Sequence, residues 1–111
     1  MRNRIERIEE VVEQLPLVSV LIPTYNRPRY FEKALCSVLE QTYPNIEIIV
    51  GDDSTNDETE KVLQKYLCDH LNIIYIKNRS TLGQFENALM LFHEANGEYI
   101  NFLMDDDIFH V

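Results

Sequence analysis

Glycine is scarce in this chain, which has only three glycines among 111 residues. Glycine-rich phosphate-binding loops need several glycines, because their backbone has to approach a phosphate group closely. The sequence contains neither the G-x-G-x-x-G fingerprint of dinucleotide-binding proteins nor the G-x-x-x-x-G-K-[ST] pattern of a P-loop. These two common modes of nucleotide binding are therefore excluded, and any nucleotide site must be built in another way.

Cysteine is also scarce, since Cys36 and Cys68 are the only two and lack the C-x-x-C spacing of a metal or redox site. Both fall within helical patterns, so we expect buried, free thiols in a reducing compartment. No signal peptide is visible, and no apolar run approaches membrane-spanning length. We therefore expect a protein of the cytoplasm, either free or at the cytoplasmic face of the membrane.

Basic residues are outnumbered, with 10 Lys and Arg against 19 Asp and Glu, which gives a formal net charge of −9. This balance argues against a nucleic-acid partner, because the phosphate backbone would repel an acidic surface. It permits a nucleotide ligand, provided that a divalent cation bridges the negative charges. The length and the 45% apolar content fit one globular domain at most.

Residues 1–15 form a charged amphipathic segment that we expect to be helical. Ile5, Ile8, Val12 and Leu15 recur at alternating spacings of three and four, which is a hydrophobic seam two heptads long. Such a seam can pack on the domain or pair with a second copy in a homodimer. Pro16 ends the segment, and residues 17–111 form the domain proper.

From residue 18 onward, strand and helix patterns alternate. Short apolar runs predict strands at 18–22, 46–50, 73–76 and 99–103. Helical spacing of apolar residues predicts helices at 28–39, 55–67 and 83–96, and Thr55 with Glu58 has the spacing of a capping box. This alternation predicts a Rossmann-like α/β fold, with a four-stranded parallel sheet and helices on both faces. The short, apolar last strand is expected to be buried.

Polar clusters follow three of the four predicted strands, at residues 24–27, 52–53 and 105–107. Parallel strands bring their carboxyl ends to one edge of the sheet, so these clusters can share one site. The last cluster is the acidic triplet Asp105, Asp106 and Asp107, whose charges repel one another. A divalent cation with oxygen ligands is one counter-charge, and a solvated acidic turn is the alternative. The shared edge favours the ligand site.

Two acidic groups at such an edge suit a particular chemistry. An aspartate can accept hydrogen bonds from a base N–H or from ribose hydroxyls. A second aspartate can hold a cation that neutralises a diphosphate, and a metal-bound diphosphate is a good leaving group. The pattern therefore favours transfer of a group from a nucleoside diphosphate.

Four segments resemble consecutive motifs of the family 2 glycosyltransferases of the GT-A fold. They are residues 18–27 (VSVLIPTYNR), 37–44 (SVLEQTYP), 46–57 (IEIIVGDDSTND) and 97–103 (GEYINFL), the last followed by the acidic run. The resemblance covers about residues 17–111, in order and at the right spacing. It implies a nucleotide-diphosphate sugar donor, usually a uridine diphosphate sugar. It also implies a Mn²⁺ or Mg²⁺ ion, and transfer to a glycan or other acceptor with inversion at the anomeric carbon.

The resemblance also implies roles for individual residues. Thr24 and Tyr25 would line the base pocket, with Tyr25 stacking on the ring, and Asp53 would accept a hydrogen bond from the base N–H. Asp105 would face the ribose, and Asp106 would bind the metal with assistance from Asp105.

The role of Arg27 stays open between contact with a phosphate and simple exposure to solvent. The sequence also departs from the family pattern at three places. One is the segment before the last strand, where Gly83 and Asn87 fit a subset of the family but the arginine-asparagine pair common elsewhere is absent. Asp53 is followed by Ser54 rather than glycine, and Met104 stands where the first aspartate of the metal motif usually lies. Asp107 is either a supporting acid or a solvated one.

The catalytic domain of this family is roughly twice as long as this chain. Its second half supplies the acceptor pocket and the catalytic base, so we expect this chain to be the donor-binding half and inactive alone. Whether it is a piece of a longer protein or naturally short stays open. A receiver-like phosphoacceptor domain is disfavoured, because no acid follows the first strand. A non-catalytic nucleotide-binding or interaction module remains an alternative.

Overall fold

The computed structural model describes residues 15–104, in which strands and helices alternate along the chain. The elements are β1 (Val18–Thr24), α2 (Pro28–Leu39), β2 (Ile46–Asp52), α3 (Glu58–Leu67), β3 (Ile73–Lys77), α4 (Gln84–Glu94) and β4 (Tyr99–Phe102). The predicted order of elements is confirmed. The amphipathic seam, apart from Leu15, and the acidic triplet lie outside the described residues.

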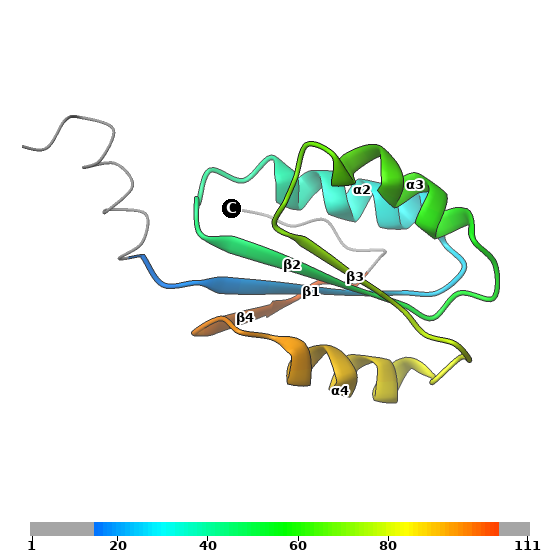
Figure 1. Cartoon of the computed structure of the whole chain (residues 1–111). Coiled ribbons are helices and arrows are strands. Elements are labelled where there is room, and N and C mark those ends of the chain that lie inside the picture. Colours follow the sequence, from blue (N-terminus) through cyan, green and yellow to red (C-terminus); the bar gives the residue numbers. More distant parts are fainter. Residues whose placement is uncertain (1–14, 105–111) are drawn as a thin grey trace, which may run out of the picture.

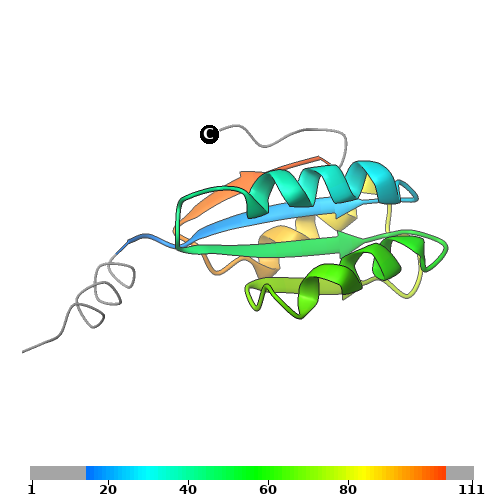
Figure 2. The same cartoon turned by 90° about the horizontal axis from the view of Figure 1, so that it is seen from above.

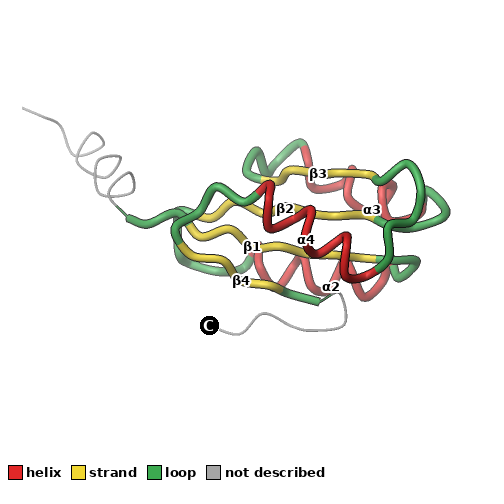
Figure 3. The backbone as a smooth tube through the Cα atoms, turned by 90° about the horizontal axis from the view of Figure 1, so that it is seen from below, coloured by secondary structure: helices red, strands yellow, loops and turns green. Residues whose placement is uncertain are grey.

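The four strands form one parallel sheet in the order β3-β2-β1-β4. Helices α2 and α3 cover one face of this sheet, and α4 covers the other (Figures 1 and 2). Seen from below, α4 crosses the sheet as the sole helix of its layer among the described residues (Figure 3). This three-layer arrangement confirms the predicted Rossmann-like α/β fold with helices on both faces.

The core lies on both faces of the sheet because successive strand residues point in opposite directions. In β1, Val20 and Ile22 are buried against α2 and α3, whereas Leu21 is buried against α4. Helix α2 contributes four buried residues at helical spacing, which are Phe31, Ala34, Leu35 and Val38. Pro28 occupies the first turn of this helix, where its missing N–H costs nothing.

Helix α3 begins later than predicted. It starts at Glu58 with Asp57 as its N-cap. The Asp57 side chain makes no capping hydrogen bond, and the Glu58 N–H donates to Asn56 Oδ1 at 3.1 Å instead. Thr55 is instead bound to the neighbouring loop, because its backbone N–H donates to Asn26 Oδ1 at 2.9 Å. The predicted capping box of Thr55 and Glu58 is therefore wrong, since a contact across the fold replaces the local one.

The last strand is less buried than predicted. Tyr99 is 62% exposed and Ile100 is 44% exposed. These residues of β4 are exposed because β4 lies at an edge of the sheet and pairs only with β1 among the described strands.

The two cysteines are both free, but their burial differs from the prediction. Cys68 is exposed at the C-cap of α3, so the expectation of a buried thiol is wrong there. Cys36 is half-buried, with its Sγ 3.3 Å from the Tyr66 hydroxyl.

Over residues 15–104, the helices are all too short or too polar to cross a membrane.

At the amino ends of the strands, a hydrogen-bond cluster connects β1, β2 and the turn after α4. Glu47 accepts hydrogen bonds from the Ser19 hydroxyl at 2.5 Å and from the Asn96 backbone N–H at 2.7 Å. The Ser19 hydroxyl oxygen accepts in turn from the Gly97 N–H at 2.8 Å. Burial acts to raise the pKa of the Glu47 carboxyl, but the hydrogen bonds from Ser19 and Asn96 outweigh it and hold that pKa below its ordinary value.

Because the folded state lowers the pKa of Glu47, the contribution of its carboxylate to the stability of the fold should be present at neutral pH and lost under acid conditions. The carboxylate stabilises the fold above the ordinary pKa of 4.5, and this stabilisation disappears as the pH falls through the lowered folded-state pKa. We expect Glu47→Gln to cost about 1 kcal/mol of unfolding free energy at pH 7. Urea denaturation of the parent and the variant at pH 7 and below pH 4 would measure this. Exposed Glu98 offers the control Glu98→Gln, and an equal difference at both pH values would contradict the assignment.

Candidate functional site

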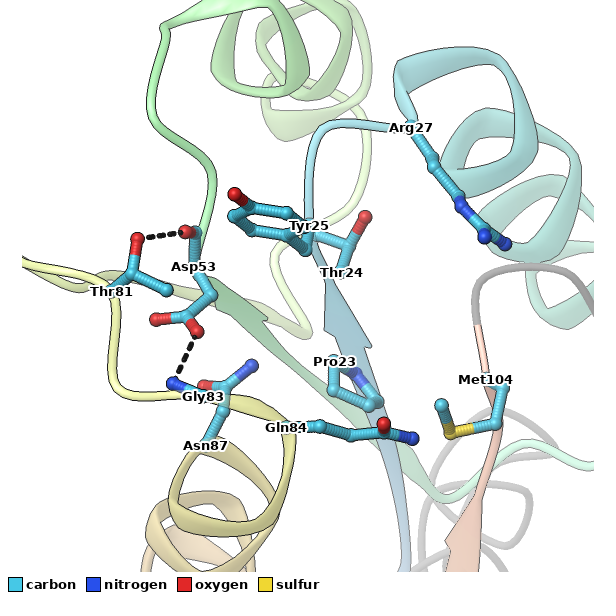
Figure 4. A pocket seen from close by; sticks show the side chains of 10 residues that line it. All are labelled: Pro23, Thr24, Tyr25, Arg27, Asp53, Thr81, Gly83, Gln84, Asn87 and Met104. Carbon is cyan, nitrogen blue, oxygen red and sulfur yellow. Dashed lines mark hydrogen bonds between the residues drawn. The ribbon is translucent and has the colours of Figure 1, made fainter.

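A pocket of about 410 Å³ lies beyond the carboxyl ends of the strands. The loops after β1, β2 and β3 and the end of β4 all border it, as expected for a parallel α/β sheet. Its lining residues are Pro23, Thr24, Tyr25, Arg27, Asp53, Thr81, Gly83, Gln84, Asn87 and Met104. In Figure 4, Asp53, Thr81, Gly83 and Asn87 gather on one side of the pocket, with Arg27 and Met104 on the other.

The loop after β1 is held to the loop after β2 by Asn26. This residue has φ of 51°, in the left-handed region that asparagine tolerates better than most side chains. Its backbone N–H donates to the Ser54 hydroxyl at 2.9 Å, and its Oδ1 accepts from the Thr55 N–H. Its neighbours Tyr25 and Arg27 consequently take fixed places at the pocket, where Tyr25 is 49% exposed.

Asp53 is almost fully buried, and its carboxylate is bound by the loop between β3 and α4. Oδ1 accepts hydrogen bonds from Asn78 Nδ2 at 3.0 Å and from the Leu82 N–H at 2.8 Å. Oδ2 accepts one from the Gly83 N–H at 2.9 Å, at the start of α4 (Figure 4). A carboxylate has about four acceptor positions, so one position on Oδ2 is left for a ligand.

Behind Asp53, the neighbouring Asp52 is fully buried and serves the loop rather than the pocket. Its Oδ2 accepts a hydrogen bond from the Tyr75 hydroxyl at 2.7 Å and lies 3.6 Å from Lys77 Nζ. Lys77 also donates to the backbone carbonyls of Ser54 and Asn56. Burial, followed by the bond to the Asp52 carboxylate, raises the pKa of Tyr75, which keeps its hydroxyl protonated as a donor.

On the opposite side of the pocket, Arg27 lies above an aromatic ring. Its Cζ is 5.8 Å from the centroid of the Tyr30 ring, within range of a cation–π interaction. Figure 4 shows the Arg27 side chain extending toward the side of the pocket where Met104 lies. The guanidinium is therefore at the border of the pocket, on the same side as Met104.

The structure brings four predicted site residues to one pocket, namely Thr24, Tyr25, Arg27 and Asp53. Their roles toward a ligand stay predictions. Asp105, Asp106 and Asp107 lie outside the described residues, although Met104 directly before them lines the pocket. Within residues 15–104, no three His, Cys, Asp or Glu side chains gather in a way that could hold a metal ion.

Sequence reasoning missed several lining residues, above all Thr81 in the loop before α4 and Gln84, the first residue of α4. The rule that drew attention to the other loops would have found them, because residues 78–84 also follow the carboxyl end of a strand.

The receiver-like alternative gains no support, since β1 ends at Thr24 and the pocket takes Pro23, Thr24 and Tyr25 from that end.

Several curated proteins with related sequences are named as glycosyltransferases. A GalNAc(5)-diNAcBac-PP-undecaprenol beta-1,3-glucosyltransferase from Campylobacter jejuni is 38% identical over 94 residues, which are 84% of this chain and 30% of that protein. A chondroitin synthase from Escherichia coli is 32% identical over 104 residues, covering 92% of this chain and 15% of that protein. The chain therefore spans less than a third of the length of these relatives.

Solved structures with the same fold are GT-A glycosyltransferases. The mannosyltransferase PcManGT from Pyrobaculum calidifontis, in complex with GDP-Man and Mn²⁺, matches with a TM-score of 0.78 at 23% identity, over 90% of this chain and 30% of that one. S. aureus TarS 1–349 in complex with UDP-GlcNAc matches with a TM-score of 0.75 at 30% identity, over 83% of this chain and 27% of that one. The sequence profile of "Glycosyl transferase family 2" matches residues 19–111, and the chain belongs to this family.

Proposed function

We propose that this chain is the donor- and metal-binding part of an inverting glycosyltransferase that uses a nucleotide-diphosphate sugar, with uridine diphosphate as the carrier. The observation that carries this proposal is the pocket at the carboxyl edge of the sheet, which combines an exposed aromatic ring with a fixed carboxylate. Solved relatives of the same fold hold GDP-Man with Mn²⁺ and UDP-GlcNAc, and this supports a nucleotide sugar as the ligand.

In this proposal, the described residues bind and orient the nucleotide. Tyr25 stacks on the base, and the open position on Asp53 Oδ2 accepts the base N–H. Arg27, at the far border of the pocket, contacts the diphosphate. Thr24, only 3% exposed, forms the pocket wall between the base and the sheet.

The residues that follow Met104 suit a divalent cation. Asp105 and Asp106 continue the chain from a pocket-lining residue, and carboxylate oxygens are the ligands that Mg²⁺ and Mn²⁺ take. We propose Asp106 as the metal ligand, with Asp105 assisting it and facing the ribose. Asp53 does not fit this role, because three donors already bind its carboxylate. When bound, the cation would neutralise the diphosphate and make it a better leaving group.

The proposal also assigns acceptor binding and the catalytic base to parts of the enzyme other than this chain. The chain covers 30% of the Campylobacter jejuni relative, and we propose that the rest of such a protein supplies both functions. The chain alone would then bind the donor and transfer no sugar. We also propose a glycan acceptor at the cytoplasmic membrane face. The name of that relative contains GalNAc(5)-diNAcBac-PP-undecaprenol, and this supports a glycan as the acceptor.

Metal and nucleotide should bind with positive coupling, because the cation is shared between Asp106 and the diphosphate. We expect Mn²⁺ to strengthen the binding of uridine diphosphate by about 1–3 kcal/mol. Asp106→Asn removes the charge but keeps the shape, so it should abolish this strengthening and leave the fold intact. Calorimetric titration of uridine diphosphate, with and without Mn²⁺, measures both effects. The same dependence on Mn²⁺ in Asp106→Asn as in the parent would refute the metal assignment.

A further inference from the structure

A chain of side-chain amides runs from the backbone of β2 to the Asp53 carboxylate. The Nδ2 of Asn87, a residue only 2% exposed, donates to the Gly51 carbonyl oxygen at 3.0 Å. The Oδ1 of Asn87 accepts from Asn78 Nδ2 at 3.0 Å. The same Asn78 nitrogen donates to Asp53 Oδ1 at 3.0 Å. One asparagine amide thus uses its two N–H groups for two different acceptors.

The orientation of each amide in this chain follows from its fixed end. The Gly51 carbonyl can only accept, so Asn87 must present its nitrogen there and its oxygen toward Asn78. Asn78 must then present its nitrogen to Asn87, which turns the second N–H toward Asp53. A side chain at Gly51 would collide with this arrangement, since an added Cβ would lie 2.7 Å from Asn87 Oδ1.

The backbone of Asn78 is fixed as well. Its N–H donates to the Asp52 carbonyl oxygen at 3.0 Å, which extends the pairing between β2 and β3 by one residue. The side chain therefore reaches Asp53 from an anchored position, directly after the last residue of β3.

The consequence concerns the two oxygens of Asp53. Asn78 and the Leu82 N–H both bind Oδ1, whereas Oδ2 has a single partner among the described residues, the Gly83 N–H. The remaining acceptor position of the carboxylate is therefore on Oδ2. A ligand in the pocket can use it, because Asp53 lines the pocket. We propose that Asn78 is a positioning residue that saturates Asp53 Oδ1 and so directs Oδ2 to read the nucleobase. This inference rests on the proposed function, in which the pocket holds the base of a nucleotide sugar.

Such an arrangement predicts selectivity between bases. Uracil carries an N–H donor at N3, whereas cytosine has an acceptor there, and a fixed carboxylate oxygen would bind the first and repel the second. If the carboxylate could rotate freely, a water molecule or the cytosine amino group could satisfy it instead. The preference for uracil therefore depends on the donors that prevent rotation, which are the Leu82 and Gly83 N–H groups and Asn78 Nδ2. Asn78 is the one side chain among these three donors, so its contribution can be removed by substitution.

The test compares uridine diphosphate with cytidine diphosphate on the parent chain and on Asn78→Ala. We expect calorimetry to show that Asn78→Ala weakens binding of uridine diphosphate by about tenfold and binding of cytidine diphosphate by less, so that the ratio of the two affinities falls. The matched control is Asn72→Ala at the other end of β3, whose Nδ2 donates to the Ile46 carbonyl at 3.0 Å. This variant loses one side-chain amide hydrogen bond, whereas Asn78→Ala loses two, and it should keep the parent's ratio.

A second variant protects the test against a folding defect. Asn78→Asp keeps the size of the side chain, exchanges both N–H donors for oxygen acceptors, and should lower the ratio at least as far as Asn78→Ala. Circular dichroism would confirm that each variant is folded, and Asn78→Ala decides alone if Asn78→Asp does not fold.

The outcomes separate the inference from the proposed function. An unchanged ratio in Asn78→Ala would overturn the positioning role while the nucleotide site stands. A fall in the ratio for Asn72→Ala as well would also overturn it, because the effect would then follow from general loosening of β3. Failure of the parent to bind either nucleotide would overturn the proposed function itself, and the base-reading role with it.

Discussion

Exchanging Asp53 for asparagine should weaken binding of uridine diphosphate by about a hundredfold and lower the unfolding free energy by about 2 kcal/mol. Three donors converge on this carboxylate, which are Asn78 Nδ2 and the backbone N–H groups of Leu82 and Gly83. An asparagine brings a fourth donor among them, so at least one N–H loses its acceptor. The loop between β3 and α4 then shifts at the pocket wall, and the base loses its acceptor too.

Equilibrium unfolding in urea and calorimetric titration with uridine diphosphate would measure the two effects separately. Asp69→Asn serves as the control, because exposed Asp69 lies in the turn after α3 and should change neither quantity. Weakened binding should persist without Mn²⁺, in contrast to the metal-dependent loss expected for Asp106→Asn. If Asp53→Asn bound uridine diphosphate as tightly as the parent, Asp53 would be a purely structural residue.

The substitution Gly97→Ala is expected to cost about 3 kcal/mol of unfolding free energy. An added Cβ would lie 2.7 Å from the Ser19 backbone nitrogen and 2.8 Å from the Leu17 carbonyl oxygen. Backbone atoms cannot turn aside as a flexible side chain can, so the start of β4 would have to move away from β1. That movement would also break the bond from the Gly97 N–H to the Ser19 hydroxyl.

Gly83→Ala provides the matched comparison for this prediction. Gly83 has φ of 93°, and no atom lies within 4 Å of a Cβ added there, so the cost is backbone strain alone, about 1 kcal/mol. Urea unfolding curves of both variants should therefore place Gly97→Ala well below Gly83→Ala in stability. The reverse order would show that the start of β4 adapts more easily than the structure indicates.

The fold followed from the sequence because its signals are local and repeated. The apolar runs at residues 18–22 and 46–50 form β1 and β2, and both are buried on two faces as such runs predict. The alternation of strands and helices then restricted the possible topologies of the sheet to a few, since connections between parallel strands are short and right-handed. The carboxyl-end rule for parallel sheets likewise predicts that Thr24, Tyr25 and Asp53 share one edge, and all three line the pocket there.

The remaining features depend on contacts between distant residues, which sequence periodicity does not reveal. Thr55 has the spacing of a helix cap, but Asn26 binds it from 29 residues away. The partners of Asp53 lie in a loop 25–30 residues further along the chain. The exposure of β4 depends likewise on its place at the sheet edge, which its own apolar residues do not show.

The strand order has a consequence for how the chain folds during synthesis. β1 is the first strand made among the described residues, yet one of its two neighbours, β4, is the last, and their pairing joins Val18 to Tyr99. β2 and β3 can add to the other side of β1 in the order in which they leave the ribosome. The β4 side of β1 stays unpaired until the chain has been translated as far as β4, about 80 residues after β1. For that interval the nascent chain carries an open, apolar strand edge, the kind of surface that chaperones shield and that otherwise recruits strands from other chains.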